Sequence, residues 1–208
     1  MVTADKYFDK IYYLNLEKDV DRNKNMLKQF EQFNIMNFKR IEGITLDNIP
    51  EDQSLYRNFI RGGDKYVLGS LGCRASHLKA IKDAKENGYK KILIFEDDVV
   101  MLNDPSFFLQ NSVNLEWDML YFAGLVEQQF RNQIVQAHAY ALSWKVFNDI
   151  IYMAESSGME IDNFYAKILQ HMSYNYNPGG RYRVRITQPF NGIIQDKGFE
   201  SNIVASSV

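Results

Sequence analysis

The chain has 208 residues, of which 46% are hydrophobic, 24% charged and 14% aromatic. This composition provides a sizeable core, and it excludes collagenous, disordered and disulfide-scaffold proteins. We expect a single domain spanning residues 1–208, because α/β domains reach about 200 residues. The formal net charge of -2 leaves no overall positive surface for a phosphate backbone, so no nucleic-acid partner is expected.

Cysteine usage and hydropathy indicate a compartment. The single cysteine, Cys73, cannot form an internal disulfide, which favours a reducing environment. The stretch from Met1 to Lys6 lacks the apolar core of about 7–15 residues found in signal peptides. No window approaches the roughly 20 apolar residues of a membrane span. We therefore expect a cytoplasmic protein that works on any membrane-bound product from the cytosolic side, or a chain whose leader has been removed.

Strand and helix patterns alternate along the chain. The first half predicts a strand at 11–16, a helix capped by Asp19 or Asp21, a strand at 38–41, a long loop at 42–65, a helix from Ser70 to Gly88 and a strand at 92–95. The second half predicts a helix after Asp104-Pro105, strands at 117–123 and 134–142, a helix capped by Ser143, a helix at 162–172 and a strand at 181–186. This alternation predicts an α/β domain around a mostly parallel sheet.

Three acids follow the apolar run at 92–95, which is typical of a strand buried on both faces. In open α/β sheets, ligands bind outside the carboxyl ends of the strands. If the backbone stays extended, Glu96 and Asp98 project to one side and Asp97 to the other. Two carboxylates on one side suit Mg²⁺ or Mn²⁺, which prefer hard oxygen ligands. The alternative is that the acids only mark a strand leaving the core into a solvated turn.

Several segments, in this order, resemble glycosyltransferase family 25, which includes lipopolysaccharide-biosynthesis and collagen galactosyltransferases. The most specific are Gly72-Cys73-x-x-Ser76-His77 and Glu96-Asp97-Asp98. The resemblance covers roughly positions 11 to 203 and also includes Asn15-Leu16, Asp21-Arg22, Leu68 to Ala75, Trp117-Asp118, Ala139 to Ser143 and Ile161-Asp162.

The resemblance implies a single-domain GT-A-like (Rossmann-like) fold and a nucleotide-sugar transferase. It implies that Glu96 and Asp98 hold Mn²⁺ or Mg²⁺ on the donor diphosphate, and that Asp97 binds the ribose hydroxyls. The remaining residues that it assigns to the donor are Asn15, Arg22, Gly72, Ser76 and His77. The alternatives are a solvated arginine in a first helical turn for Arg22 and a surface or core histidine without a donor role for His77. A metal on the donor diphosphate is chemically reasonable, because a cation that neutralises the departing phosphate oxygens lowers the activation barrier of sugar transfer.

Asp162 has two interpretations. The resemblance places it near the acceptor, where a carboxylate can take the proton of the acceptor hydroxyl as a general base. As the residue after Ile161, it could instead cap the next helix.

Other polar and aromatic residues also leave two interpretations. His138 and His171 are candidate late metal ligands or structural histidines. Three arginines on one predicted strand face form either an anion grip or the exposed face of an edge strand, and three tyrosines either stack on sugars or pack in the core. These residues are Arg181, Arg183, Arg185, Tyr174, Tyr176 and Tyr182.

The leading hypothesis is a metal-dependent inverting transferase that moves a hexose, galactose or glucose, from a UDP-sugar to a hydroxyl of a glycan or glycoconjugate. The chain would contact a membrane only peripherally, with residues 199–208 as a tail. A nucleotidyltransferase is an alternative, although Gly62-Gly63 and Gly69-x-x-Gly72 are too sparse for a phosphate loop. A second alternative is a non-catalytic carbohydrate-binding protein of the same fold.

Overall fold

A six-stranded sheet forms the centre of the computed structural model, which describes residues 2–45, 48, 64–127, 133–157, 159–173, 179–187 and 192–196. The strands lie in the order β2 (Phe38–Glu42), β1 (Lys10–Asn15), β3 (Lys91–Glu96), β6 (Gln133–Ser143), β5 (Met119–Glu127) and β7 (Val184–Ile186). The pairs β1–β2, β1–β3 and β5–β7 are parallel, whereas β6 runs antiparallel to both of its neighbours. The predicted α/β class with a mostly parallel central sheet is confirmed.

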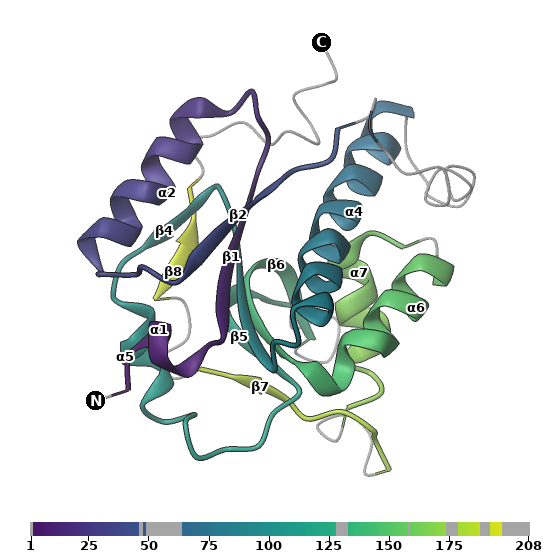
Figure 1. The fold of residues 1–208 in the computed structure, drawn as a ribbon. Coiled ribbons are helices and arrows are strands. Elements are labelled where there is room, and N and C mark those ends of the chain that lie inside the picture. Colours follow the sequence, from purple (N-terminus) through teal and green to yellow (C-terminus); the bar gives the residue numbers. More distant parts are fainter. Residues whose placement is uncertain are drawn as a thin grey trace.

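Helices cover both faces of this sheet (Figure 1). One face packs against α1 (Ala4–Tyr7), α2 (Val20–Gln32) and α5 (Pro105–Leu109). The other face packs against α4 (Asp64–Glu86), α6 (Phe147–Ser157) and α7 (Ile161–Phe164). The result is a three-layer arrangement in which the central strands have no solvent-facing side.

The alternation of side chains along β1 explains why its apolar run has no polar interruptions. Ile11 and Tyr13 belong to the core on the α2 side, and Tyr12 and Leu14 belong to the core on the α4 side. All four side chains are buried. A strand with two covered faces needs apolar residues at every position, as the sequence at 92–95 also showed.

The helix α4 begins earlier than the sequence predicted. It starts at Asp64, so Ser70 lies inside the helix and is buried, and the prediction of an N-cap at Ser70 is wrong. The helix runs through Gly69 without a break, and no proline lies between Asp64 and Ser70, so the serine did not have to mark a start. The predicted end is confirmed, because Gly88 adopts a φ of 70° and Tyr89 N–H donates to Ala84 O at 3.0 Å. Most of the predicted loop at 42–65 lies outside the described residues.

Several smaller elements refine the predicted order. Asp104 caps α5 by accepting from Ser106 N–H at 2.7 Å, and Ser143 caps the 3₁₀ turn η4 (Trp144–Val146), as predicted. The helix predicted at 162–172 is α7 followed by a π-helical segment, η5 (Tyr165–Leu169). The sequence did not predict the small antiparallel sheet of β4 (Val99–Met101) and β8 (Ile193–Gln195).

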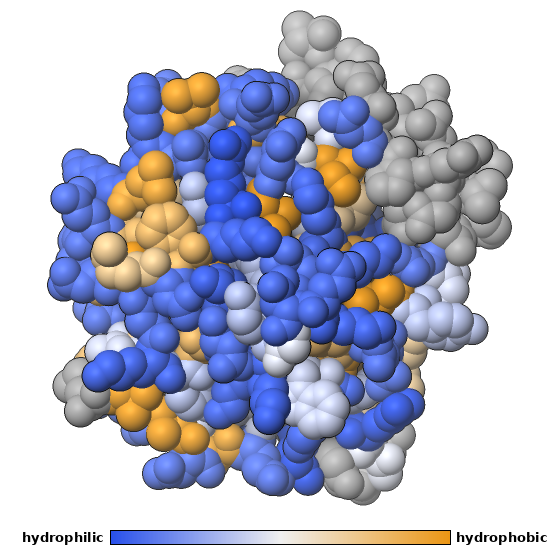
Figure 2. All heavy atoms as spheres, viewed as in Figure 1, coloured by the Kyte–Doolittle hydropathy of each residue, from blue (hydrophilic) through white to orange (hydrophobic). Residues whose placement is uncertain are grey.

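The surface is mostly hydrophilic in the view of Figure 2, where hydrophobic residues form separate small areas. Single exposed apolar side chains such as Met36 and Tyr152 are ordinary on a globular surface. Within the described part of the chain, no helix combines the length and the apolar character that crossing a bilayer requires.

Candidate active site

The candidate site lies where β1 and β3 end at the same edge of the sheet. Asn15 is the last residue of β1, Glu96 is the last residue of β3, and Leu14 pairs with Glu96 in the parallel register. Asp97 and Asp98 form the turn between β3 and β4. This is the position at which open α/β sheets bind ligands, as predicted from the sequence.

Asp97 holds together the first residues of this site. Its Oδ1 accepts from Arg22 Nη1 at 2.9 Å, and its Oδ2 accepts from Asn15 Nδ2 at 2.7 Å. Burial raises the pKa of Asp97, while the hydrogen bonds from Asn15 and Arg22 oppose that rise. Because both carboxylate oxygens are already engaged, Asp97 fixes the positions of Asn15 and Arg22 at the end of β1 and the start of α2.

Asp98 lies beside the same arginine. Its Oδ2 accepts from Gln195 Nε2 at 3.0 Å and lies 3.9 Å from Arg22 Nη1. Its Oδ1 is buried and accepts no hydrogen bond from the described residues. A buried carboxylate oxygen without a protein donor is suited to bind a cation or a donor group of a ligand.

The predicted alternation of the three acids is wrong. Asp97 and Asp98 both lie near Arg22, whereas Glu96 turns to the other side and meets His77. The physical reason is that the extended backbone stops at Glu96, and side-chain alternation does not continue through a turn.

Glu96 and His77 begin a buried hydrogen-bonded chain. Glu96 Oε1 lies 3.2 Å from His77 Nε2, and His77 Nδ1 lies 2.7 Å from Tyr140 Oη, which in turn accepts from Tyr165 Oη at 3.1 Å. Burial lowers the pKa of His77 to about 4, against the opposing charge of Asp162. Burial, helped by the charges of Asp98 and Asp97, raises the pKa of Glu96 to about 8. At neutral pH this arrangement favours a neutral imidazole.

Asp162 approaches the same group from α7. The N-cap of α7 is Glu160, and Asp162 lies in the first turn, so the interpretation of Asp162 as the helix cap is wrong. Burial raises the pKa of Asp162 to about 7, and the charge of Glu96 adds to that rise while His77 opposes it. Asp162 Oδ1 is buried and has no hydrogen-bond partner among the residues that the structure describes. The fold therefore brings Asp162 to the acids, which are far from it in sequence.

Gly72 and Ser76 join α4 to the segment that follows β2. Ser76 Oγ donates to Gly72 O at 2.7 Å and accepts from Ile44 N–H at 2.8 Å. A Cβ on Gly72 would collide with the backbone oxygen of Ile44. These contacts show that Gly72 allows close backbone approach and that Ser76 fixes the chain at Ile44.

Replacing Gly72 with alanine should lower stability. Alanine gains about 1 kcal/mol in helix propensity, but its Cβ would collide with backbone, and overpacking costs about 1–3 kcal/mol. Thermal unfolding should therefore show a lower Tm than that of the wild type. The matched control is Ser70→Ala on the same helix, which removes a buried hydroxyl that has no partner within the described ranges, so its Tm should be unchanged or higher. A Gly72→Ala Tm equal to that of the wild type would contradict the packing argument.

Some sequence candidates lie in the site and others do not. His138 is buried on β6, one register step from the Phe95–Ala139 pair and therefore opposite Glu96. Burial lowers the pKa of His138, against the charge of Asp98. His171, by contrast, is exposed. The sequence assigned no role to Tyr140, Tyr165 or Gln195, although Tyr140 lies in the Ala139 to Ser143 segment of the family resemblance. Neither strand alternation nor helical spacing marks a residue whose partner is distant.

The predicted arginine face does not form. β7 contains only Val184–Ile186, and Arg181 and Arg183 are paired with Asp149 at 3.0 Å and Glu116 at 2.6 Å. The interpretation as the polar surface of an edge strand fits, because β7 ends the sheet. Tyr182 is buried and donates to Asp149, so it belongs to the core, whereas Tyr174 and Tyr176 lie outside the described residues.

The residues present fit a divalent cation with oxygen ligands. Four carboxylates gather here, from Glu96, Asp97, Asp98 and Asp162, and Arg22 supplies positive charge beside two of them. The buried oxygens Asp98 Oδ1 and Asn15 Oδ1 have no hydrogen-bond partner in the described part of the chain. Carboxylate and amide oxygens are the ligands that Mg²⁺ and Mn²⁺ accept.

Comparison with solved structures defines the class of the fold. The chain is similar to the crystal structure of a glycosyltransferase involved in the glycosylation of the major capsid of PBCV-1, with a TM-score of 0.50 and 14% identity, covering 86% of this chain and 81% of that one. The architecture is that of the GT-A-like glycosyltransferases.

Sequence comparison then gives the family. The model of glycosyltransferase family 25 (LPS biosynthesis protein) matches residues 8–174, and the chain belongs to this family. Similar proteins are a glycosyltransferase 25 family member of Drosophila pseudoobscura pseudoobscura (29% identical) and procollagen galactosyltransferase 1 of Danio rerio (27%). A third is the inactive glycosyltransferase 25 family member 3 of Homo sapiens (24%). Each match covers 55% of this chain but only 20% or 21% of the relative, so the chain matches about a fifth of their length.

Proposed function

We propose that the protein is a metal-dependent inverting glycosyltransferase that moves a hexose, galactose or glucose, from a UDP-sugar to a hydroxyl of a glycan or glycoconjugate. The observation that carries this proposal is the gathering of buried carboxylates at the ends of β1 and β3, with Asp98 Oδ1 lacking a hydrogen-bond partner among the described residues. The name of the galactosyltransferase from Danio rerio supports galactose as the first sugar to test.

In this proposal Asp98 and Glu96 hold Mn²⁺ or Mg²⁺, for which the Glu96 carboxylate would turn from His77 toward Asp98. The metal, when bound, would neutralise charge on the departing diphosphate. Asp97 fixes both Asn15 and Arg22, and Arg22 would offer a permanent charge to the phosphates. Because both oxygens of Asp97 are engaged, its contribution to donor binding is to position these two side chains. Gly72 and Ser76 act on the donor by holding the chain at Ile44 in place.

Asp162 is the proposed general base. The acceptor oxygen forms a bond to the sugar C1 while the bond from C1 to the phosphate oxygen breaks, and the hydroxyl proton passes to Asp162 Oδ1. That oxygen accepts no hydrogen bond from the described residues, so it is available for the acceptor hydroxyl. His77, held by Tyr140 and Glu96, lies close enough to Asp162 to affect the charge of that carboxyl. A direct displacement of this kind inverts the configuration at C1.

The proposed cellular location rests on the cysteine content and the hydropathy of the sequence. We propose that the enzyme acts in the cytoplasm and meets lipid-linked acceptors of the lipopolysaccharide type by peripheral contact with the inner face of a membrane. The single cysteine is compatible with this reducing compartment.

A donor panel tests the proposal. UDP-galactose, UDP-glucose and GDP-mannose are each added with Mn²⁺ or with a chelator, and thermal unfolding is followed. A UDP-hexose at 100 times its Kd should stabilise the protein by about 2.7 kcal/mol, and only with the metal. Slow hydrolysis of the donor, measured as UDP formed when water accepts the sugar, then reports turnover. The anomeric configuration of the sugar product reports whether the reaction inverts.

Each outcome of the panel has a separate meaning. Equal stabilisation in chelator would contradict metal dependence, and retention of configuration would contradict the inverting mechanism. Stabilisation without any turnover on glycan acceptors or water would favour the non-catalytic alternative, which the human relative named inactive makes worth testing.

A further inference from the structure

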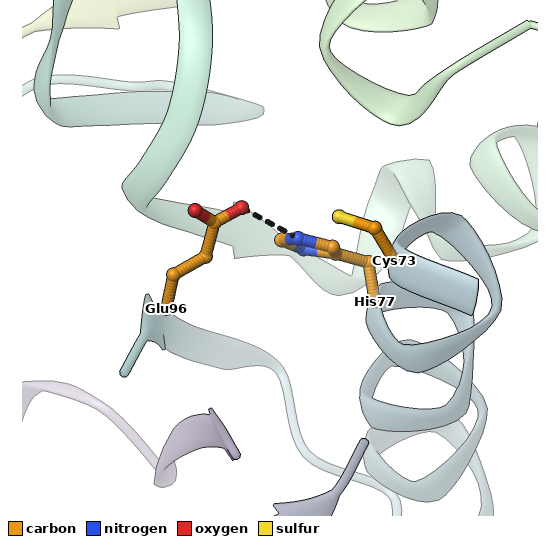
Figure 3. Close-up of side chains that lie close together, drawn as sticks. All are labelled: Cys73, His77 and Glu96. Atoms are coloured by element: carbon orange, nitrogen blue, oxygen red, sulfur yellow. Dashed lines mark hydrogen bonds and ion pairs between the residues drawn. The ribbon is translucent and has the colours of Figure 1, made fainter. Parts of the chain in front are cut away.

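Three potential metal ligands of mixed type, Cys73, His77 and Glu96, lie close together (Figure 3). Cys73 and His77 are four residues apart on α4, so their side chains lie on one face of the helix. Glu96 reaches them from the end of β3. The ligand atoms of the three residues lie within 4.8 Å of one another.

The spacing suits a small tetrahedral ion. Zinc–nitrogen and zinc–oxygen bonds of about 2.0–2.2 Å hold their two ligand atoms about 3.3 Å apart in tetrahedral geometry, and His77 Nε2 lies 3.2 Å from Glu96 Oε1. A thiolate ligand requires about 3.6 Å to that nitrogen. Small rotations of the Cys73 and Glu96 side chains, both of which are only partly buried, would bring the atoms to these distances.

The second nitrogen of His77 is already oriented as in metal sites. Its Nδ1 is 2.7 Å from Tyr140 Oη, and Tyr140 is itself held by Tyr165. A metal-ligating histidine usually uses its other nitrogen in a hydrogen bond that fixes the ring. With the Nδ1 proton donated to Tyr140, the Nε2 lone pair faces Glu96 and Cys73.

We propose that Cys73, His77 and Glu96 form a binding site for a thiophilic divalent transition ion of the zinc type, distinct in ligand chemistry from the oxygen site at Asp98. Sulfur and imidazole ligands select zinc-like ions, whereas magnesium and manganese favour carboxylates and water. Burial, together with the charges of Glu96, Asp162 and Asp98, raises the pKa of the Cys73 thiol, so binding of the ion would release the thiol proton. Three protein ligands leave a fourth position open.

One consequence rests on the proposed function. Glu96 would belong to both sites, so an ion bound by Cys73 and His77 would withdraw Glu96 from the Mn²⁺ or Mg²⁺ that the transferase uses. Zinc at this site would then inhibit transfer. The binding proposal itself is independent of whether the protein transfers sugar.

Cobalt provides a spectroscopic test with the whole protein. Co²⁺ replaces zinc at such sites, and a cobalt–thiolate bond gives a charge-transfer band in the near ultraviolet. Because Cys73 is the only cysteine in the chain, such a band can come from no other residue. We expect the band in the wild type, its loss in Cys73→Ser and its displacement by Zn²⁺. Tyr140→Phe should weaken cobalt binding by about 10–100-fold, because it removes the partner of His77.

Asp98→Asn is the matched control, because it alters the oxygen site and leaves the three ligands in place. It should keep the cobalt–thiolate band even if sugar transfer is lost, which separates this proposal from the proposed function. Saturating Co²⁺ without a thiolate band in the wild type would overturn the site, as would a band that Zn²⁺ does not displace. Both results are obtained on the wild-type protein and do not depend on a variant folding.

Discussion

Asp98→Asn should reduce sugar transfer by about 10³-fold or more while leaving the fold intact. A metal contributes several kcal/mol of charge stabilisation, and each 1.36 kcal/mol is a factor of ten in rate. The asparagine keeps the size of the side chain and an oxygen for Gln195, but it removes a charged ligand from the cation. The measurements are kcat with saturating Mn²⁺ and Tm.

Two comparisons make this result specific. Asp104→Asn is the same chemical change at a helix cap, where asparagine serves equally well, so its activity and Tm should match the wild type. A chelator should abolish wild-type transfer, and added Mn²⁺ should restore it. Full activity of Asp98→Asn, or of the wild type in excess chelator, would remove the metal from the mechanism.

Asp162→Asn should lower turnover by about 10²–10⁴-fold, because the amide cannot take the acceptor proton. Donor binding and fold should persist, since Glu160 and not Asp162 caps α7. The matched control is Glu160→Gln, two residues away, which keeps the hydrogen bond to Asn163 and should retain turnover. Near-normal kcat in Asp162→Asn would exclude the base assignment.

The pH dependence of Asp162 has a definite sign. Its pKa is raised from 3.8 to about 7 in the folded protein, so the folded state favours the protonated carboxyl. The contribution of Asp162 to stability is therefore complete below pH 3.8 and is lost as the pH rises to about 7. The neutral amide of the Asp162→Asn variant carries no such loss, so the Tm of this variant above pH 7 should equal or exceed that of the wild type.

The catalytic profile follows from the same shift. A base must be ionised, so wild-type kcat should fall as the pH drops below about 7. A cation bound beside Glu96 would offset the Glu96 charge that raises this pKa, so Mn²⁺ should move the acid limb to lower pH. The residual activity of Asp162→Asn should not show this fall of kcat at low pH.

Local sequence patterns predicted most of the architecture. Apolar runs such as 92–95 identify buried strands. Asp104-Pro105 marks the start of a helix and Gly88 marks the end of another, because these signals depend only on neighbouring residues. The same reasoning failed at Ser70, where a capping residue lies inside a longer helix. The strand β8 was missed because three residues carry too little periodicity to detect.

The candidate site shows a similar division. The sequence placed Glu96, Asp97 and Asp98 at a strand end, where the structure has them, but their orientations depend on where the strand stops. Gly72 and Ser76 stood out in the sequence for donor binding, whereas the structure gives them contacts with the backbone at Ile44. Tyr140 and Gln195 could not be assigned to the site from sequence, because their partners His77 and Asp98 lie 63 and 97 positions away in the chain.

The small sheet of β4 and β8 affects how the protein can be shortened. Residues 192–196 return to the acidic turn, where Gln195 donates to Asp98 Oδ2 and Asp196 N–H donates to Asp98 O at 2.6 Å. Gly192 lies against the ring of Phe108, where a Cβ would have no room. The family match stops at residue 174, well before this segment. A fragment trimmed to the family boundaries would keep every acid of the site but lose the hydrogen bonds that Gln195 and Asp196 donate to Asp98. The boundaries of an expressed fragment should therefore be chosen from these contacts rather than from the matched region.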